Sequence, residues 1–194
     1  MSKPPSKPLL GTKIALLVSN GFNEQDLTVV QRALLDAGAN MRIVSAEQGL
    51  VHSWNGEGWG HHYAIDSPLG SALGADFSML VIPGGTRSMD KLKLTAHTKR
   101  FIGSFMATEK PVAVCGDAIN ILVYTDNIRG RTVTGPDRLQ DIVKQAGGNW
   151  SDVKTSLADG NLLTGVCTDE ASRRLFATKV VDSFISHATM EKAA

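Results

Sequence analysis

Short apolar runs rich in β-branched residues alternate along the chain with longer stretches in which apolar residues return every third or fourth position. Runs of the first kind are typical of strands that are buried on both faces of a parallel sheet. Stretches of the second kind are typical of helices that bury one face against such a sheet. The pattern predicts buried strands at residues 13–18, 40–45, 77–82 and 112–114.

Helices are predicted after most of these strands. Leu27, Val30 and Leu34 fall on one helical face. Asn23 is placed to cap the start of that helix, and Gly38 suits its C-terminal end. Further helices are predicted at about residues 95–108, over 139–146 and at about 169–187, with a short helix or loop at 66–74.

Two hairpins are predicted from turn dipeptides. Asn55-Gly56, within residues 51–63, favours the left-handed backbone that a tight hairpin turn requires. Asp159-Gly160 is a second signal of the same kind, between predicted short strands at residues 153–156 and 161–164. A further short strand is predicted to follow a turn within residues 129–133.

Strands that alternate with helices predict an α/β fold, with a mostly parallel sheet covered by helices on both faces. In sheets of this kind, ligands bind beyond the carboxyl ends of the strands. The turns at Gly21, Gly84 and Gly116 each follow a predicted strand. We therefore expect these three turns to surround one crevice.

The segment from Lys110 to Leu122 (KPVAVCGDAINIL) turns from a buried strand directly into a predicted helix. This is the geometry of a nucleophile elbow, in which one residue of strained backbone stands above the sheet. Cys115 is the candidate nucleophile, and a thiol at a helix N-terminus can have a lowered pKa. Gly116 is the residue that best tolerates the strained turn. If Gly116 is the apex, the Cys115 sulfur packs under a helix, because successive strand side chains alternate.

The 194 residues suit a single domain, expected at residues 11–188 between a flexible tail at 1–10 and a flexible C-terminus at 189–194. The formal net charge is +1 with mixed signs, which gives no electrostatic case for nucleic acid or an anionic membrane. No apolar run reaches membrane-spanning length, and residues 1–8 lack the apolar segment of a signal peptide. Two cysteines are too few for a disulfide framework, so the chain is predicted to be cytoplasmic.

Several short motifs occur in order over nearly the whole chain. They are Gly21-Phe-Asn-Glu-Gln-Asp-Leu27, Asn55-Gly56-Glu57, Ile82-Pro-Gly-Gly85, Asp90-Lys-Leu92, Lys110-Pro-Val-Ala113, Arg129-Gly-Arg131 and Gly147-Gly-Asn-Trp150. Each motif alone is weakly specific. In this order and spacing, they make the chain resemble the ThiJ/PfpI superfamily, a branch of the class I glutamine amidotransferase-like fold. The resemblance implies a flavodoxin-like sandwich.

The resemblance also implies what the protein does. Known activities of the family depend on a cysteine and include peptidase or amidase and glyoxalase or deglycase reactions, while some members are described as chaperones. A hydrolase or a stress-related protein without a cofactor is therefore expected. Family members are commonly dimers or larger assemblies, so the expected partner is a second copy of the chain, in a homodimer or higher homo-oligomer.

The sequence departs from the family pattern at the elbow, which usually reads Ala-x-x-Cys-His-Gly-Pro after Lys-Pro. An ungapped match across the segment puts Gly116 on the nucleophilic cysteine. Asp117 and Ala118 then fall on the histidine and the glycine that follow it. Bringing Cys115 into register would need a one-residue slip, which turns the later strand side chains to the wrong face. The run Gly116-Asp117-Ala118 also resembles the C-terminal domain of large-subunit catalases, which carries no catalytic cysteine.

Other site residues are implied by the resemblance, one position at a time. The acid that hydrogen-bonds the nucleophile falls on Asp26, where the family usually has glutamate. The acid lent by a neighbouring subunit in the peptidase branch falls on Asp90. Gly84 and Gly85 would supply oxyanion-type backbone donors. The alternatives are a solvated first-turn carboxylate at each aspartate and simple turn chemistry at the two glycines.

Three functional hypotheses follow. The favoured one is a non-catalytic family member that acts through binding, oligomerisation or a chaperone-like stress role, because Gly116 and Asp117 occupy the elbow. This hypothesis involves no metal and no cofactor. The alternative is a hydrolase or glyoxalase in which Cys115 is the nucleophile, with Asp26 and Asp117 beside it. In the third, Asp26, Asp117 and Asp90 form a carboxylate site in which one pKa rises or a cation such as Mg²⁺ or Ca²⁺ binds.

Overall fold

A computed structural model describes residues 7–193, apart from the side chain of residue 192. Seven strands form the main sheet, in the spatial order β11-β12-β8-β7-β1-β3-β6. Every pairing in this sheet is parallel except that of β11 with β12, at one edge. The strands are β1 (Lys13–Leu17), β3 (Asn40–Ser45), β6 (Ser67–Pro68), β7 (Met79–Ile82), β8 (Val112–Cys115), β11 (Ser156–Asp159) and β12 (Leu162–Gly165). The mostly parallel α/β sheet is confirmed.

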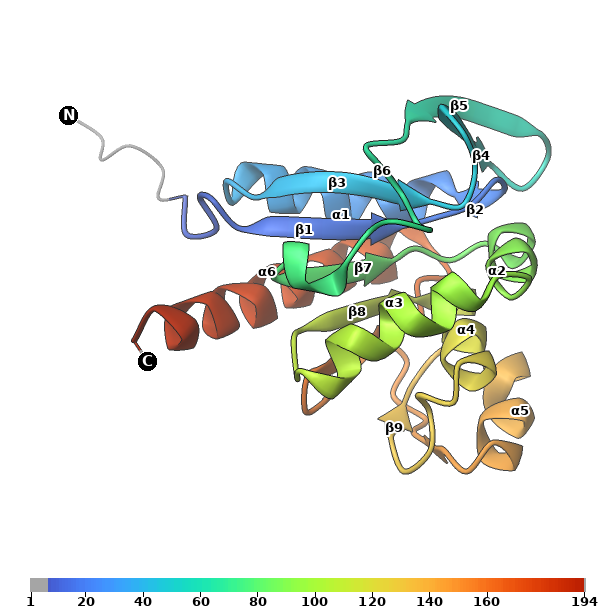
Figure 1. The fold of residues 1–194 in the computed structure, drawn as a ribbon. Coiled ribbons are helices and arrows are strands. Elements are labelled where there is room, and N and C mark those ends of the chain that lie inside the picture. The colour runs from blue at the N-terminus through green and yellow to red at the C-terminus, as the bar shows by residue number, and fades with distance from the viewer. Residues whose placement is uncertain (1–6, 194) are drawn as a thin grey trace.

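Helices cover both faces of this sheet (Figure 1). On one face lie α1 (Glu24–Asp36) and the C-terminal helix α6 (Glu170–Ala193). On the other lie α2 (Thr86–Leu92), α3 (Ala96–Ala107), α4 (Ile119–Tyr124) and α5 (Gln140–Gln145). Single 3-10 turns occupy Gly74–Asp76, Gly116–Ala118 and Asp137–Leu139.

The central strands divide their side chains between two buried clusters. Val112 and Val114 of β8 belong to the cluster under α2, α3 and α4. Ala113 and Cys115 of the same strand belong to the cluster under α1 and α6. This alternation follows from the two-residue period of a strand, and it explains why the strands read as continuous apolar runs. The last side chain of β8 therefore points into the α1–α6 layer.

The hairpin predicted at Asn55-Gly56 joins β4 (Leu50–Trp54) to β5 (Trp59–Ala64), which lie at the top right of Figure 1. The Asn55 side-chain oxygen accepts the backbone N–H groups of Glu57 and Gly58, at 3.0 and 2.9 Å, and so closes the turn. A two-residue strand, β2 (Phe22–Asn23), pairs with β4 and ties the hairpin to the start of α1. The second short sheet consists of β9 (Thr132–Val133) and β10 (Asn149–Trp150).

Three local predictions differ from the structure. The strand expected at residues 153–156 was wrong, because the antiparallel register through the Asp159-Gly160 turn starts β11 only at Ser156. Helix α2 was not predicted, since only Met89 and Leu92 of its seven residues are large and apolar. Helix α6 continues beyond the expected end to Ala193. Of the tail expected at residues 1–10, residues 1–6 lie outside the described part, and Leu9 is fully buried.

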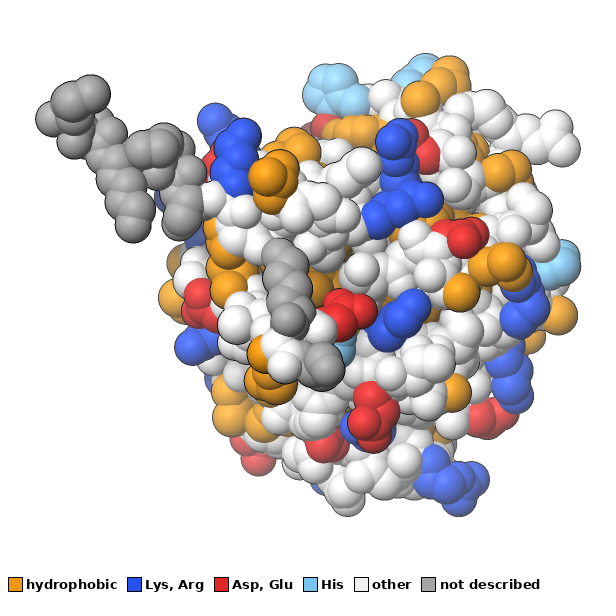
Figure 2. All heavy atoms as spheres, turned by 60° about the vertical axis from the view of Figure 1, so that its left-hand side comes forward, with side chains coloured by type: hydrophobic (Ala, Val, Ile, Leu, Met, Phe, Trp, Pro, Cys, Tyr) orange, Lys and Arg blue, Asp and Glu red, His pale blue; other side chains and the backbone are white. Residues whose placement is uncertain are grey.

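Charged side chains of both signs are interspersed over the face drawn in Figure 2, as the balanced composition predicts. Across residues 7–193, no helix is long and apolar enough to cross a membrane.

Candidate functional site at the strand–helix elbow

The elbow, residues Cys115–Ala118, joins the end of β8 to α4 through one 3-10 turn. Gly116 is its apex, with a φ of +50° in the left-handed region. A Cβ added at this position would make only ordinary contacts, the nearest being 3.5 Å from the carbonyl oxygen of Val166. The backbone angle is therefore the reason for glycine at this position, since the space above Gly116 would admit a Cβ.

Cys115 does not face that space. Its side chain is 1% exposed, and its Sγ lies 3.1 Å from the Sγ of Cys167; both residues are free thiols. Burial raises the pKa of the Cys115 thiol well above its usual range, and the contact with Cys167 raises it further. A nucleophilic cysteine needs the opposite shift. In this conformation, Cys115 is a core residue.

Asp26 lies beside the apex, in the first turn of α1. Asn23 caps this helix by accepting the backbone N–H groups of Gln25 and Asp26. The Asp26 carboxylate accepts a hydrogen bond from Nε of Arg173 at 2.6 Å and from the Gly84 backbone N–H at 3.2 Å. Burial raises the pKa of Asp26 to about 6, although Arg173 and Gly84 both favour its ionised form. At neutral pH, a buried ion pair therefore joins α1 to α6.

Asp117 follows the apex and forms the opposite side of the site. Its carboxylate forms an ion pair with Arg138 and accepts a hydrogen bond from Oγ1 of Thr86 at 3.1 Å. The side chain of Arg138 is 61% exposed, so this pair lies at the solvent-facing edge. The carboxylate that follows the apex is thus held by a guanidinium.

Two adjoining pockets open at the elbow, and we call them together the elbow pocket. The inner one has a volume of about 220 Å³ and the outer one of about 290 Å³. Both are bordered by Asn23, Gly85, Asp117 and Arg173. The charged side chains that line the two pockets are those of Asp26, Asp117, Arg87, Arg138 and Arg173. Three guanidinium groups against two carboxylates make the lining positive.

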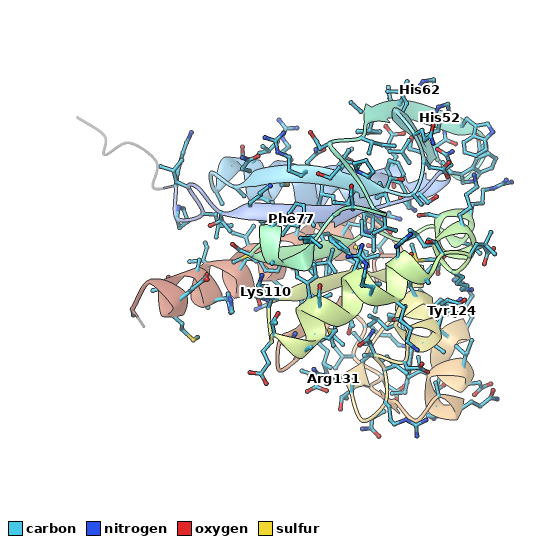
Figure 3. All side chains as sticks on the ribbon, in the orientation of Figure 1. His52, His62, Phe77, Lys110, Tyr124 and Arg131 are labelled. Carbon is cyan, nitrogen blue, oxygen red and sulfur yellow. The ribbon has the colours of Figure 1, made fainter. Side chains whose placement is uncertain are left out.

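The hairpin borders the outer pocket through Trp54, Asn55 and Gly56. The guanidinium of Arg87 lies 4.1 Å from the centre of a Trp54 ring, and the Trp59 ring packs edge-on against Trp54. On the same hairpin, His52 and His62 stack with ring centres 4.0 Å apart, and Figure 3 shows the two together at the upper edge. Of these aromatic side chains, Trp54 lines the outer pocket, and Trp59 packs behind it.

The structure brings together only part of the predicted site. Gly21, Gly84 and Gly116 do surround one crevice, because Gly21 and Gly116 line it and Gly84 binds its buried acid. The N–H of Gly84 is occupied by Asp26 and so is not a free oxyanion donor. Asp90 is 65% exposed on α2 and pairs with Lys93 at 3.3 Å. It does not line the pocket.

The carboxylates do not form a cluster of the kind that binds a metal. Asp26 and Asp117 each have a guanidinium partner, and Asp90 lies apart from both. Within residues 7–193, no group of three histidine, cysteine or acidic side chains could hold a metal ion.

Sequence reasoning missed the three arginines and the contact between the two sulfurs. One signal could have indicated Arg173: it stands in the first turn of α6, where the helix dipole disfavours a cation unless an acidic partner is near.

The central strand of the parallel α/β sheet turns through a left-handed residue into a helix, and a buried acid lies beside the turn. These features define a class of α/β proteins whose site lies at a strand–helix elbow. The chain belongs to the DJ-1/PfpI family, whose sequence profile matches residues 12–183. The expected family is thereby confirmed. The finer resemblance of Gly116–Ala118 to a catalase domain stays a prediction.

Two relatives from Bacillus subtilis are similar along most of their length. General stress protein 18 is 25% identical over 161 residues, which cover 83% of this chain and 92% of that protein. YraA, named as a candidate cysteine protease, is 28% identical over 162 residues with the same coverage. Among solved structures, a ThiJ/PfpI domain protein from Brachyspira murdochii superposes with a TM-score of 0.79, at 19% identity, over 91% of this chain and 98% of that one. This structural likeness supports the flavodoxin-like fold.

Proposed function

We propose that this DJ-1/PfpI family member binds a small anion in the elbow pocket and does not attack an organic substrate through Cys115. The main observation in support of the proposal is the geometry of the elbow. Gly116 occupies the strained apex, while the sulfur of Cys115 is buried against Cys167 on the other side of the strand. No thiol of the elbow residues faces the space where a substrate would lie.

The charge of the lining supports an anionic ligand. Arg138 is largely exposed, and Arg173 becomes available whenever Asp26 takes up a proton. Guanidinium groups bind carboxylates through paired hydrogen bonds. The inner volume of about 220 Å³ corresponds to roughly seven water molecules. A short carboxylate such as lactate, pyruvate or glyoxylate is of suitable size.

The cellular role that we propose is stress-related, in the cytoplasm and as a homo-oligomer. Family membership supports it, and a relative is named as a general stress protein. A chaperone-like contribution belongs to the same proposal.

Calorimetry with lactate and with its neutral amide tests the anion site. Lactate should bind and lactamide should not, and Arg138→Gln should weaken lactate binding at least about tenfold, because a hydrogen bond to a charged group is lost. Arg174→Gln is the matched control, since this neighbouring arginine pairs with Glu170 on the surface of α6 and does not line the pocket. Equal binding of lactate and lactamide would contradict an anion site. An equal loss of lactate affinity in Arg138→Gln and Arg174→Gln would contradict it as well.

Thiol reactivity tests whether Cys115 can act as a nucleophile toward a substrate. In the reduced native protein, iodoacetamide should label Cys115 far more slowly than in the denatured chain, because the thiol is buried and protonated. Gly116→Cys should be labelled faster than Cys115, because Gly116 lines the elbow pocket. Conversion of methylglyoxal to lactate, or hydrolysis of a peptide amide, that Cys115→Ala abolishes would establish the alternative, a Cys115-dependent hydrolase or glyoxalase.

A further inference from the structure

Cys115 and Cys167 are the two cysteines of the chain, and nothing in the proposed anion binding uses them. They lie 52 positions apart in sequence, and their sulfur atoms are in direct contact. We propose that they form a reversible disulfide when a peroxide enters the elbow pocket, with Cys167 oxidised first and Cys115 completing the bond.

The backbone brings the two residues together. Cys115 is the last residue of β8, and in the parallel register its Cα lies opposite Gly165, the last residue of β12. Cys167 lies two positions beyond the end of β12, and its side chain joins the same buried cluster as Cys115. A disulfide bond is about 2.05 Å long. From a sulfur separation of 3.1 Å, bonding requires an approach of about 1 Å, which side-chain rotation can supply.

The two thiols differ in their access to solvent. Cys167 is 5% exposed and lines the inner part of the elbow pocket, whereas Cys115 is 1% exposed and does not line it. A small oxidant that enters from solvent therefore reaches the sulfur of Cys167 first. The backbone of Cys167 has a φ of +52°, a conformation that is uncommon for a residue with a side chain. Strain of this kind concentrates at functional sites.

Two balanced steps make the bond. The Cys167 sulfur attacks one peroxide oxygen, so a sulfur–oxygen bond forms, the oxygen–oxygen bond breaks, and water or an alcohol leaves. The sulfur of Cys115 then attacks the resulting sulfenic acid. The sulfur–sulfur bond forms, the sulfur–oxygen bond breaks, and the hydroxyl leaves as water with the proton of Cys115. The two thiols are oxidised, the peroxide is reduced, and a free thiol such as glutathione can restore both cysteines by exchange.

The disulfide would tie the end of β8 to the segment that enters α6. Gly116 follows the first of these segments and Arg173 lies in the first turn of α6, and both line the inner pocket. Oxidation would therefore fix the width of the inner pocket. It would also close a long loop, which restricts the unfolded chain and raises the melting temperature.

Intact mass spectrometry of the full reduced chain, treated with hydrogen peroxide, tests the proposal. We expect a loss of two hydrogen masses, a peptide map that joins Cys115 to Cys167, and reversal by dithiothreitol. Cys115→Ser should leave Cys167 trapped as a sulfenic acid that dimedone labels. Cys167→Ser should leave Cys115 unmodified. Circular dichroism and the melting temperature check that both variants fold, and Cys115→Ala and Cys167→Ala replace any variant that does not.

The proposal is overturned by oxygen addition to one cysteine without a bridge, or by the absence of any reaction until the protein unfolds. A bridge between two chains also contradicts it, and gel filtration of the oxidised sample detects that case. Because Cys115→Ser leaves all the arginines in place, lactate binding by this variant separates failure of the disulfide from failure of the anion site.

Discussion

Burial and charge act in opposite directions on Asp26. Burial disfavours the charged carboxylate and dominates, so the pKa rises from 3.8 to about 6. Arg173 and the N–H of Gly84 stabilise the ionised form and limit that rise. The result is a carboxylate that is ionised at neutral pH and neutral in mild acid. A single residue thus makes the charge of the elbow pocket depend on pH.

The stability difference between the wild-type protein and Asp26→Asn should depend on pH in a defined direction. The folded state holds the Asp26 proton more tightly than the unfolded chain does, so the protonated carboxyl stabilises the fold. This contribution is fully present below about pH 4 and is lost as the pH rises through about 6. At higher pH, the stability difference between the two proteins no longer changes with pH. Two pKa units correspond to about 3 kcal/mol of unfolding free energy.

Urea unfolding between about pH 3.5 and 7.5, a range that includes the unfolded pKa of 3.8 and the folded pKa of about 6, measures this difference. Asp90→Asn is the control, because that carboxylate is exposed on α2 and outside the pocket. A wild-type stability that rises relative to Asp26→Asn over the interval would contradict the prediction, because it would mean that folding lowers the pKa of Asp26.

The geometry of Gly116 and Cys115 could be predicted from the sequence because it depends on local rules. Matching the residues of β8 and the following helix without a gap places Gly116 at the apex. The alternation of side chains along a strand then gives the direction of the Cys115 sulfur. The partner of Asp26 could not be predicted in this way. Arg173 lies 147 positions further along the chain, and no local pattern fixes which side chains of α6 meet α1. Long-range side-chain pairing is a property of the packed helices.

At the scale of elements, glycine has different roles in helix α3 and strand β12. Gly103 lies inside α3, and a Cβ there would meet nothing within 4 Å. Gly165 ends β12 beneath α6, where a Cβ would overlap the ring of Phe176. The first glycine only weakens its helix, and the second lets the C-terminal helix approach the sheet.

Gly103→Ala should therefore stabilise the protein by about 0.5–1 kcal/mol, because alanine loses less backbone entropy in a helix. Gly165→Ala should destabilise it by about 1–3 kcal/mol, because Phe176 must leave its buried position. Thermal and urea unfolding of the two variants, side by side, test the pair. Equal effects of the two substitutions would mean that the packing of α6 on β12 differs from this structure.

The elements themselves could be predicted where the pattern is long or the turn chemistry is specific. The four central strands and the Asn55-Gly56 hairpin are of this kind. Helix α2 has too few large apolar residues to show a helical period, and β11 is positioned by pairing with β12. Short elements of this kind are defined by their neighbours more than by their own sequence.

At the scale of the whole molecule, α1 and α6 come from opposite ends of the chain and pack together on one face of the sheet, as Figure 1 shows. Between their apolar side chains, the ion pair of Asp26 and Arg173 is the polar contact that also reaches the elbow pocket. Both of its side chains are largely withdrawn from water. Breaking such a pair leaves one buried charge without a partner, which destabilises more than replacing both groups does.

A double-mutant cycle with Asp26→Asn and Arg173→Gln measures this coupling. At pH 7.5, Arg173→Gln alone should lower the unfolding free energy by about 3–5 kcal/mol, because the ionised Asp26 is left buried without its cation. Adding Asp26→Asn should recover part of that loss, with a coupling of about 0.5–3 kcal/mol. At pH 5, the cost of Arg173→Gln should be smaller, since Asp26 has then taken up a proton.

Arg174→Gln, at the exposed pair with Glu170, should change stability little at either pH. Additive effects of the two substitutions at pH 7.5 would mean that α1 and α6 are held together by apolar packing alone, and that the charge at the elbow is not shared between the two helices.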